Sequence, residues 1–333
     1  MFKLKNRNKQ IKYALETSQL DDFYALQMNC SKLTALFWVL NTLKMLDAEE
    51  FEEYKENALK YAQNCLSENG GFSPEPSYPT NLTSTLSGLQ IFLICKFTDF
   101  DVEKTRQYIS TRFNRATGAF SNDEFGDFDT RVDCCAILSL KLLDDLEGIR
   151  KKLHGNFFVS TSEIALSAHS KSFFDVELFV THILNCYNSD GGFSQIESGE
   201  SHAAQVFCCL SCLKLLKRLD AVDLEQVCEF LVKNQCKRTG GLMGRVNKKV
   251  DVCYSFWSYS AYKIASSYLN GENCYKINEQ KLTEFILSCE HEDGGFSDRP
   301  GNVQDIYHQM FALASHSLLG LECIKDIDII YSF

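Results

Sequence analysis

The apolar positions of this chain recur three or four residues apart, and strand-like alternation is absent. One such series occupies residues 33–46, and another occupies residues 136–143. Residues three and four apart share one face of an α-helix, so each series predicts a helix with a buried face. The pattern therefore indicates an all-α protein.

Glycine-containing turns divide the chain at steps of 48, 73, 49 and 54 residues, so three steps are near fifty residues and one is longer. A period near fifty residues fits two helices per repeat, and glycine readily adopts the positive φ angle of a turn between helices. Such αα-hairpins can form an open solenoid or close into a barrel, and the period alone does not decide between them. The turns are Asn69-Gly-Gly-Phe72, Thr117-Gly-Ala-Phe120, Asp190-Gly-Gly-Phe193, Thr239-Gly-Gly-Leu242 and Asp293-Gly-Gly-Phe296.

The one long step contains a stretch with little periodicity, from about Glu147 to Phe173, that is rich in Ser, His and Lys. We interpret it as an insertion in a loop between helices. The chain has 4 prolines and no linker-like segment. It is therefore expected to form a single domain over residues 1–333, with an insertion near residues 147–173.

Composition narrows the class of protein. Of the 333 residues, 45% are hydrophobic, which is enough for a large core, and the net charge of -10 argues against a nucleic-acid surface. No segment reaches the ~18 uninterrupted apolar residues of a membrane span. Many of the 15 cysteines lie in apolar runs, as small buried hydrophobes do. We expect a cytoplasmic protein without disulfides.

Candidate chemistry is concentrated in residues 244–257. Arg245, Lys248 and Lys249 form a positive island on an acidic chain, which is typical of a site for a small anion. Asp251 and Cys253 follow at once and can share one metal ion.

His308 could add a nitrogen ligand to that oxygen and sulfur. A lone Asp-x-Cys pair is usually chance, but catalytic zinc uses three protein ligands of these types and leaves one position for water or substrate. The combination predicts a zinc site beside an anion site.

Three motifs strongly resemble the β subunits of protein prenyltransferases. They are Ser201-His-Ala-Ala-Gln205, residues 244–257, and the segment from Asp298 to His308. The similarity covers most of the chain. It implies an α-α barrel, or toroid, whose central cavity holds an isoprenoid, with zinc at the rim and a helical α subunit wrapped around it.

The resemblance also implies roles for individual residues. The zinc ligands would be Asp251, Cys253 and His308, and Asp298 is a further candidate for holding magnesium on the diphosphate. The diphosphate-binding residues would be His202, Arg245, Lys248 and Tyr254. The isoprenoid pocket would include Thr34, Leu86, Arg131 and Trp257.

Three enzyme branches share this scaffold. Thr34 stands where farnesyltransferases carry a tryptophan that closes the cavity floor, so the resemblance favours the longer geranylgeranyl diphosphate. Asp298 stands where type I geranylgeranyltransferases carry lysine, and residues 297–301 look like the type II, or Rab, enzyme. The preferred interpretation is type II, with a Rab-type GTPase as substrate and an escort protein. Farnesyltransferase and type I β subunits remain alternatives.

A function of another class also stays open. The fifty-residue period alone would suit a noncatalytic helical-repeat scaffold that binds other proteins. The complete ligand set and the adjacent cations argue against that alternative.

Overall fold

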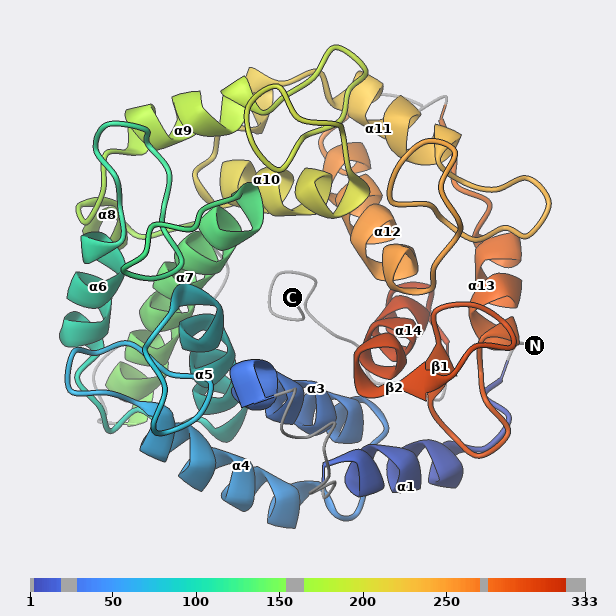
Figure 1. Ribbon diagram of the computed structural model, residues 1–333, viewed down its shortest axis with the longest axis horizontal. Helices are drawn as coiled ribbons and strands as arrows, with labels where there is room; N and C mark the ends of the chain where they lie inside the picture. Colours follow the sequence, from blue (N-terminus) through green and yellow to red (C-terminus); the bar gives the residue numbers. More distant parts are fainter. Residues whose placement is uncertain (1–2, 19–28, 154–164, 270–274, 322–333) are drawn as a thin grey trace.

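The helices form a ring with an inner and an outer layer (Figure 1). The computed structural model describes residues 3–18, 29–153, 165–269 and 275–321. The inner helices are α3 (Lys32–Met45), α5 (Leu82–Cys95), α7 (Thr130–Leu153), α10 (Ala203–Leu215), α12 (Cys253–Ser266) and α14 (Ile306–Leu318). The outer helices are α1 (Arg7–Thr17), α4 (Phe51–Cys65), α6 (Val102–Thr111), α9 (Val176–Asn185), α11 (Leu224–Lys233) and α13 (Glu279–Ser288). Shorter elements are η1 (Asn29–Ser31), α8 (Ala168–Lys171), η2 (Leu219–Ala221) and the paired strands β1 (Phe296–Ser297) and β2 (Gln304–Asp305).

The inner layer is closed. Each inner helix contacts the next one along the chain, and α14 contacts α3. The repeats therefore form a barrel and not an open solenoid. The predictions of an all-α protein and of an α-α barrel are confirmed.

The two layers differ in how much of each helix is apolar. Almost every residue of α5 from Leu82 to Phe92 is buried, whereas α4 buries only Ala58, Ala62 and Cys65. A helix that is buried on all sides must be covered on all sides, and an amphipathic helix can face water on one side. This difference places α5 in the inner layer and α4 in the outer layer.

The glycine turns join neighbouring repeats. Gly70 has a φ angle of +91°, and a Cβ atom there would lie 2.5 Å from the backbone oxygen of Lys104 in α6. Gly294 has a φ angle of +98°, and its Cβ would lie 2.2 Å from the backbone oxygen of Lys9 in α1. Only glycine fits such an approach. The last turn thus packs on the first outer helix, which closes the ring.

The stretch expected to be irregular is partly helical. Residues 147–153 form the last two turns of α7, and α8 lies near the end of the stretch, while residues 154–164 are outside the described residues. The buried Arg106 holds this part of α7 by binding two of its carboxylates, Asp144 at 3.0 Å and Glu147 at 2.8 Å. The extra length of this repeat lies between α7 and α9. The single domain stays a prediction.

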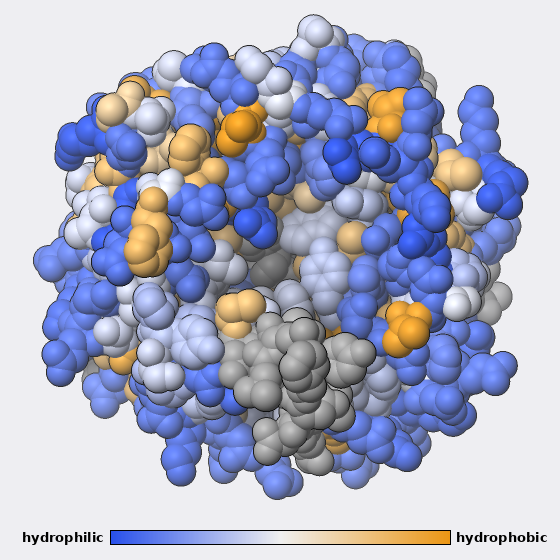
Figure 2. All heavy atoms as spheres, in the orientation of Figure 1, coloured by the Kyte–Doolittle hydropathy of each residue, from blue (hydrophilic) through white to orange (hydrophobic). Residues whose placement is uncertain are grey.

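The loops that lead from outer to inner helices lie at one end of the barrel, where the inner helices begin (Figure 1). We call these loops the rim. Figure 2 shows this face, with a hollow at the centre of the ring. Of the seven large hydrophobic residues exposed in the described part of the chain, six lie on the rim: Tyr78, Phe125, Phe128, Ile196, Val246 and Val303. None of the described helices is both long and apolar enough to cross a bilayer.

Candidate metal centre and anion site

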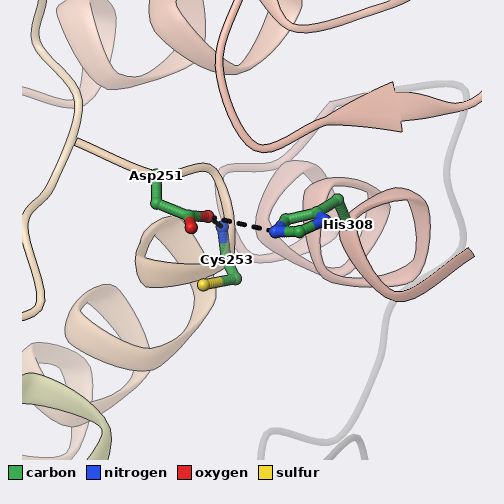
Figure 3. Close-up of side chains that lie close together, drawn as sticks. All are labelled: Asp251, Cys253 and His308. Carbon is green, nitrogen blue, oxygen red and sulfur yellow. Dashed lines mark hydrogen bonds and ion pairs between the residues drawn. The ribbon is translucent and has the colours of Figure 1, made fainter. Parts of the chain in front are cut away.

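Asp251, Cys253 and His308 lie together at the rim end of the barrel (Figure 3). Cys253 begins α12, Asp251 lies two residues before it, and His308 is in the first turn of α14. One ligand atom from each residue lies within 4.8 Å of the other two. In the described part of the chain, this is the one cluster of three or more potential metal ligands. The structure therefore brings the three predicted zinc ligands together.

Burial and close contacts inside the cluster shift the pKa values of Asp251 and Cys253. Asp251 Oδ1 accepts a hydrogen bond from the Cys253 backbone N–H at 2.9 Å and lies 3.4 Å from His308 Nε2. Burial raises the pKa of Asp251, but its hydrogen bonds with His308 and Cys253 outweigh burial and hold the pKa below its usual value. Burial and the charge of Asp251 raise the pKa of the Cys253 thiol. The carboxylate is ionised, and a metal ion would have to displace the thiol proton.

Asp305 orients the histidine, a role that was not predicted from the sequence. Its carboxylate caps α14 by accepting a hydrogen bond from the His308 backbone N–H at 2.8 Å. Its other oxygen lies 2.5 Å from His308 Nδ1. Although burial lowers the pKa of His308, its hydrogen bonds with Asp251 and Asp305 raise it to about 9. Because Asp305 engages Nδ1, the second nitrogen faces the cluster, as is typical of metal-binding histidines.

A sequence signal for Asp305 does exist. An aspartate three residues before a histidine, at the start of an apolar periodic run, is typical of a helix N-cap. Capping places the carboxylate over the first helical turn, in which His308 lies.

His202 and Tyr254 form a second pair beside the cluster. His202 caps α10, and its Nδ1 accepts a hydrogen bond from the Ala204 backbone N–H at 3.2 Å. Its Nε2 lies 3.3 Å from the Tyr254 hydroxyl. Burial and the charge of Arg245 lower the pKa of His202, so the ring is neutral at pH 7 and carries its proton on Nε2. Burial, followed by the neighbouring Cys253 and Asp251, raises the pKa of Tyr254 to about 12, so its hydroxyl keeps its proton.

The predicted cations lie on a tight turn above this pair. The Lys248 backbone N–H donates to the Arg245 backbone oxygen at 3.2 Å, and Asn247 between them has a φ angle of +61°. The turn is attached to the start of α10 because the Ala203 backbone N–H donates to the Gly244 oxygen at 2.8 Å. Turn geometry therefore brings the side chains of Arg245 and Lys248 to neighbouring positions.

Trp257 belongs to an aromatic wall on the inner helices. Its ring centroid lies 4.6 Å from that of Phe311, and its Nε1 lies 3.4 Å from the Tyr307 hydroxyl. Tyr307 also packs edge-on against Trp38 at 5.1 Å. The wall runs from Trp38 on α3 through Tyr307 and Phe311 on α14 to Trp257 on α12.

Thr34 lies on one of the inner helices of the ring. It lies in the first turn of α3, on the side of the ring opposite α10 (Figure 1), and its Oγ1 is 2.8 Å from Ser87 Oγ on α5. Leu86, the residue before Ser87, is buried. Because α3 starts at the rim, Thr34 lies at the rim end of the wall opposite α10, and its role in closing the isoprenoid pocket stays a prediction.

Two predicted residues are engaged by close neighbours. Arg131 Nη2 lies 3.2 Å from Asp129 Oδ2, and 56% of the Arg131 side chain is exposed. Asp298 binds Arg299 and Asn302, each at 2.7 Å. Both residues lie at the rim, and their roles toward lipid and magnesium stay predictions.

Comparison with known proteins identifies the family. Residues 6–333 match a family model described as "Prenyltransferase alpha-alpha toroid domain". The chain belongs to this family of prenyltransferase enzymes, which confirms the resemblance inferred from the three motifs.

Among its relatives are β subunits of protein prenyltransferases. The chain is 35% identical to the geranylgeranyl transferase type-2 subunit beta of Saccharomyces cerevisiae, over 98% of this chain and 93% of that one. It is 31% identical to the corresponding subunit of Candida albicans, over 86% and 79%. Identity to the protein farnesyltransferase subunit beta of Pyricularia oryzae is 26%, over 85% and 57%. These relatives make the chain most similar to type-2 β subunits.

Solved structures agree on the fold. Candida albicans protein geranylgeranyltransferase-I complexed with GGPP has a TM-score of 0.77 at 22% identity, covering 99% of this chain and 96% of that one. A type II terpene cyclase from Scytonema has a TM-score of 0.60 at 12% identity, covering 94% and 96%. At these identities the likeness concerns the toroid alone.

Proposed function

We propose that this chain is the catalytic β subunit of a cytoplasmic type II protein geranylgeranyltransferase. The enzyme would transfer a geranylgeranyl group from geranylgeranyl diphosphate to C-terminal cysteine thiols of Rab-type GTPases. The observation that carries the proposal is the Asp251, Cys253 and His308 cluster beside a cationic turn. The identities to two type-2 β subunits support the choice of branch.

Zinc fits this cluster because one carboxylate, one thiolate and one imidazole form a donor set typical of catalytic zinc. Bound zinc would supply a Lewis acid that keeps the substrate cysteine as a thiolate at neutral pH. Asp305 would hold His308 in the orientation that binding needs.

The remaining residues act on the diphosphate. The reaction forms a bond between the cysteine sulfur and carbon 1 of the lipid, and it breaks the bond from carbon 1 to the diphosphate oxygen. The thiol proton goes to water, and diphosphate leaves with the electron pair. Arg245 and Lys248 would balance the charge that builds on this leaving group. Tyr254 can donate its hydroxyl proton to the same group, because His202 Nε2–H can donate to the Tyr254 oxygen.

The N-termini of the inner helices α10 and α12 add to the positive charge at the proposed diphosphate site. α10 and α12 both begin at the rim, and the N-terminus of a helix carries a partial positive charge. His202 caps one of these helices and Cys253 begins the other. The diphosphate would therefore lie where two helix dipoles and two cations converge. Magnesium on Asp298 would add a further positive charge.

The function is tested by incubating the chain and a prenyltransferase α subunit with radiolabelled farnesyl or geranylgeranyl diphosphate. The acceptors are GTPases with one or two C-terminal cysteines, with and without an escort protein. Transfer of geranylgeranyl to the two-cysteine acceptor supports type II. Transfer to one-cysteine acceptors indicates type I or a farnesyltransferase. Absence of transfer to any acceptor would favour the noncatalytic scaffold.

The exposed apolar rim is the surface that we propose the α subunit covers. Phe125 and Val303 are 82% and 85% exposed, and exposed side chains of this size are common in protein interfaces. Replacing both by serine is expected to weaken the association with the α subunit at least about fivefold. Tyr268→Ser is the control, because Tyr268 is 52% exposed but lies outside the rim. Equal Kd values for both variants in titrations with the α subunit would contradict this assignment.

Thr34 is expected to set the length of the lipid. A lipid that extends from the diphosphate site across the ring meets the wall formed by α3 and α5. Thr34→Trp should shift donor preference toward farnesyl diphosphate by about 5- to 150-fold, because overpacking costs ~1–3 kcal/mol. Competition between the two donors measures the shift.

Thr34→Val is the matched control, since it keeps the volume and removes only the hydroxyl that contacts Ser87. It should leave the preference unchanged. A tryptophan variant that still prefers geranylgeranyl diphosphate would show that the end of the lipid lies elsewhere.

A further inference from the structure

A carboxylate lies within the group of residues assigned to the diphosphate. Glu200 Oε2 is 2.9 Å from Arg245 Nη1. Glu200 is in the rim loop before α10, two residues ahead of His202, and Arg245 is in the neighbouring rim loop. An acidic side chain at this position opposes the binding of an anion, so its presence requires a reason.

The Glu200 carboxylate is not needed to hold its own loop. On either side of it, Asn188 Nδ2 donates to the Gly199 backbone oxygen at 3.1 Å and to Ser201 Oγ at 2.8 Å. Ser201 Oγ in turn donates to Asp190 at 2.7 Å. The loop is thus anchored on both sides of Glu200.

The Arg245 turn is anchored independently as well, by the hydrogen bond from the Ala203 backbone N–H to the Gly244 oxygen. The side chains of Arg245 and Glu200 are 41% and 58% exposed. Ion pairs this exposed contribute little to stability and are readily broken. The contact is therefore an exchangeable one between two fixed loops.

His202 lies in the field of both charges. Burial and Arg245 lower its pKa, and Glu200 raises it. The Glu200 carboxylate therefore lies close to Arg245 and His202, and His202 contacts the Tyr254 hydroxyl. These are the residues assigned to the diphosphate.

We propose that Glu200 competes with diphosphate for Arg245. In the free enzyme it neutralises the guanidinium, and a bound diphosphate displaces it. After transfer, the carboxylate reclaims Arg245 and favours release of the inorganic diphosphate product. This inference rests on the proposed function, because it takes Arg245 as a diphosphate ligand.

The test measures inhibition of the chain with its α subunit by inorganic diphosphate. Glu200→Gln keeps the side-chain shape and removes the charge, so the inhibition constant should fall about three- to fivefold, the scale of an exposed ion pair. The gain should shrink at ~1 M salt, where the Debye length is about 3 Å. Glu197→Gln, an exposed carboxylate in the same loop, is the matched control and should change the constant little.

The pairing is tested by repeating Glu200→Gln in an Arg245→Ala background, where its effect should vanish. The proposal is overturned if Glu200→Gln leaves the constant unchanged or raises it, if Glu197→Gln lowers it equally, or if the effect survives without Arg245. Failure of the proposed function would give a different set of results. In that case inorganic diphosphate would not inhibit the wild type, and Arg245→Ala would keep its full rate, which overturns both ideas.

Discussion

Cys253→Ala is expected to lose its zinc and to slow prenyl transfer at least about 100-fold, because even the residues that orient zinc ligands are worth 10- to 100-fold. Cys253 supplies the only sulfur in the cluster with Asp251 and His308. Removing it leaves two ligands, too few for a catalytic zinc site. Elemental analysis of the purified protein and single-turnover rates with saturating lipid are the measurements.

Cys209→Ala is the control for the loss of a buried thiol. Cys209 is fully buried on α10, and it is not part of the metal cluster. Losing so small a group from the core typically costs only about 1 kcal/mol, so both variants should fold. Full zinc content and a normal rate in Cys253→Ala would show that the metal assignment is wrong.

Asp305→Asn refines the same experiment. Asparagine still caps α14, so the helix start is kept, but the carboxylate against His308 Nδ1 is lost. Zinc affinity should fall about 10- to 100-fold, less than with Cys253→Ala. Unchanged affinity would limit Asp305 to capping the helix.

Periodicity alone could not predict the closed ring, which was expected from the resemblance of the three motifs. Helical spacing and glycine turns predict hairpins, but closure depends on the contact between Gly294 and Lys9, nearly the whole chain apart. Periodicity describes neighbours along the chain and contains no such contact. The same limit applies to the contact between Glu147 and Arg106, which are far apart in the sequence.

The candidate site was predictable where local motifs contain it. Asp251 and Cys253 are two residues apart at the start of one helix, and His308 comes from a second motif. For Asp305, the sequence signal predicts a helix cap, but it does not contain the second contact, between the Asp305 carboxylate and the His308 ring. The Glu200 contact with Arg245 joins two rim loops, and no spacing in the sequence encodes it.

Arg245→Ala and Lys248→Ala should each slow the chemical step about 30- to 1000-fold, since a positioned donor to a developing anion contributes roughly 2–4 kcal/mol. The two residues stand at the ends of one turn, beside the His202 and Tyr254 pair. Because they would act on charge that builds as the bond to diphosphate breaks, the single-turnover rate should fall more than the affinity for the lipid.

Lys249→Ala is the matched control for Lys248→Ala. Both lysines are exposed, and both substitutions remove one positive charge from adjacent positions. If the turn merely attracts anions through its net charge, the two variants should slow transfer equally, and the loss should disappear at high salt. If Lys248 contacts the leaving group, Lys248→Ala is slow and Lys249→Ala is not, and the zinc content of Lys248→Ala stays normal. Equal rates in all three variants and the wild type would reduce Arg245 and Lys248 to ordinary surface charge.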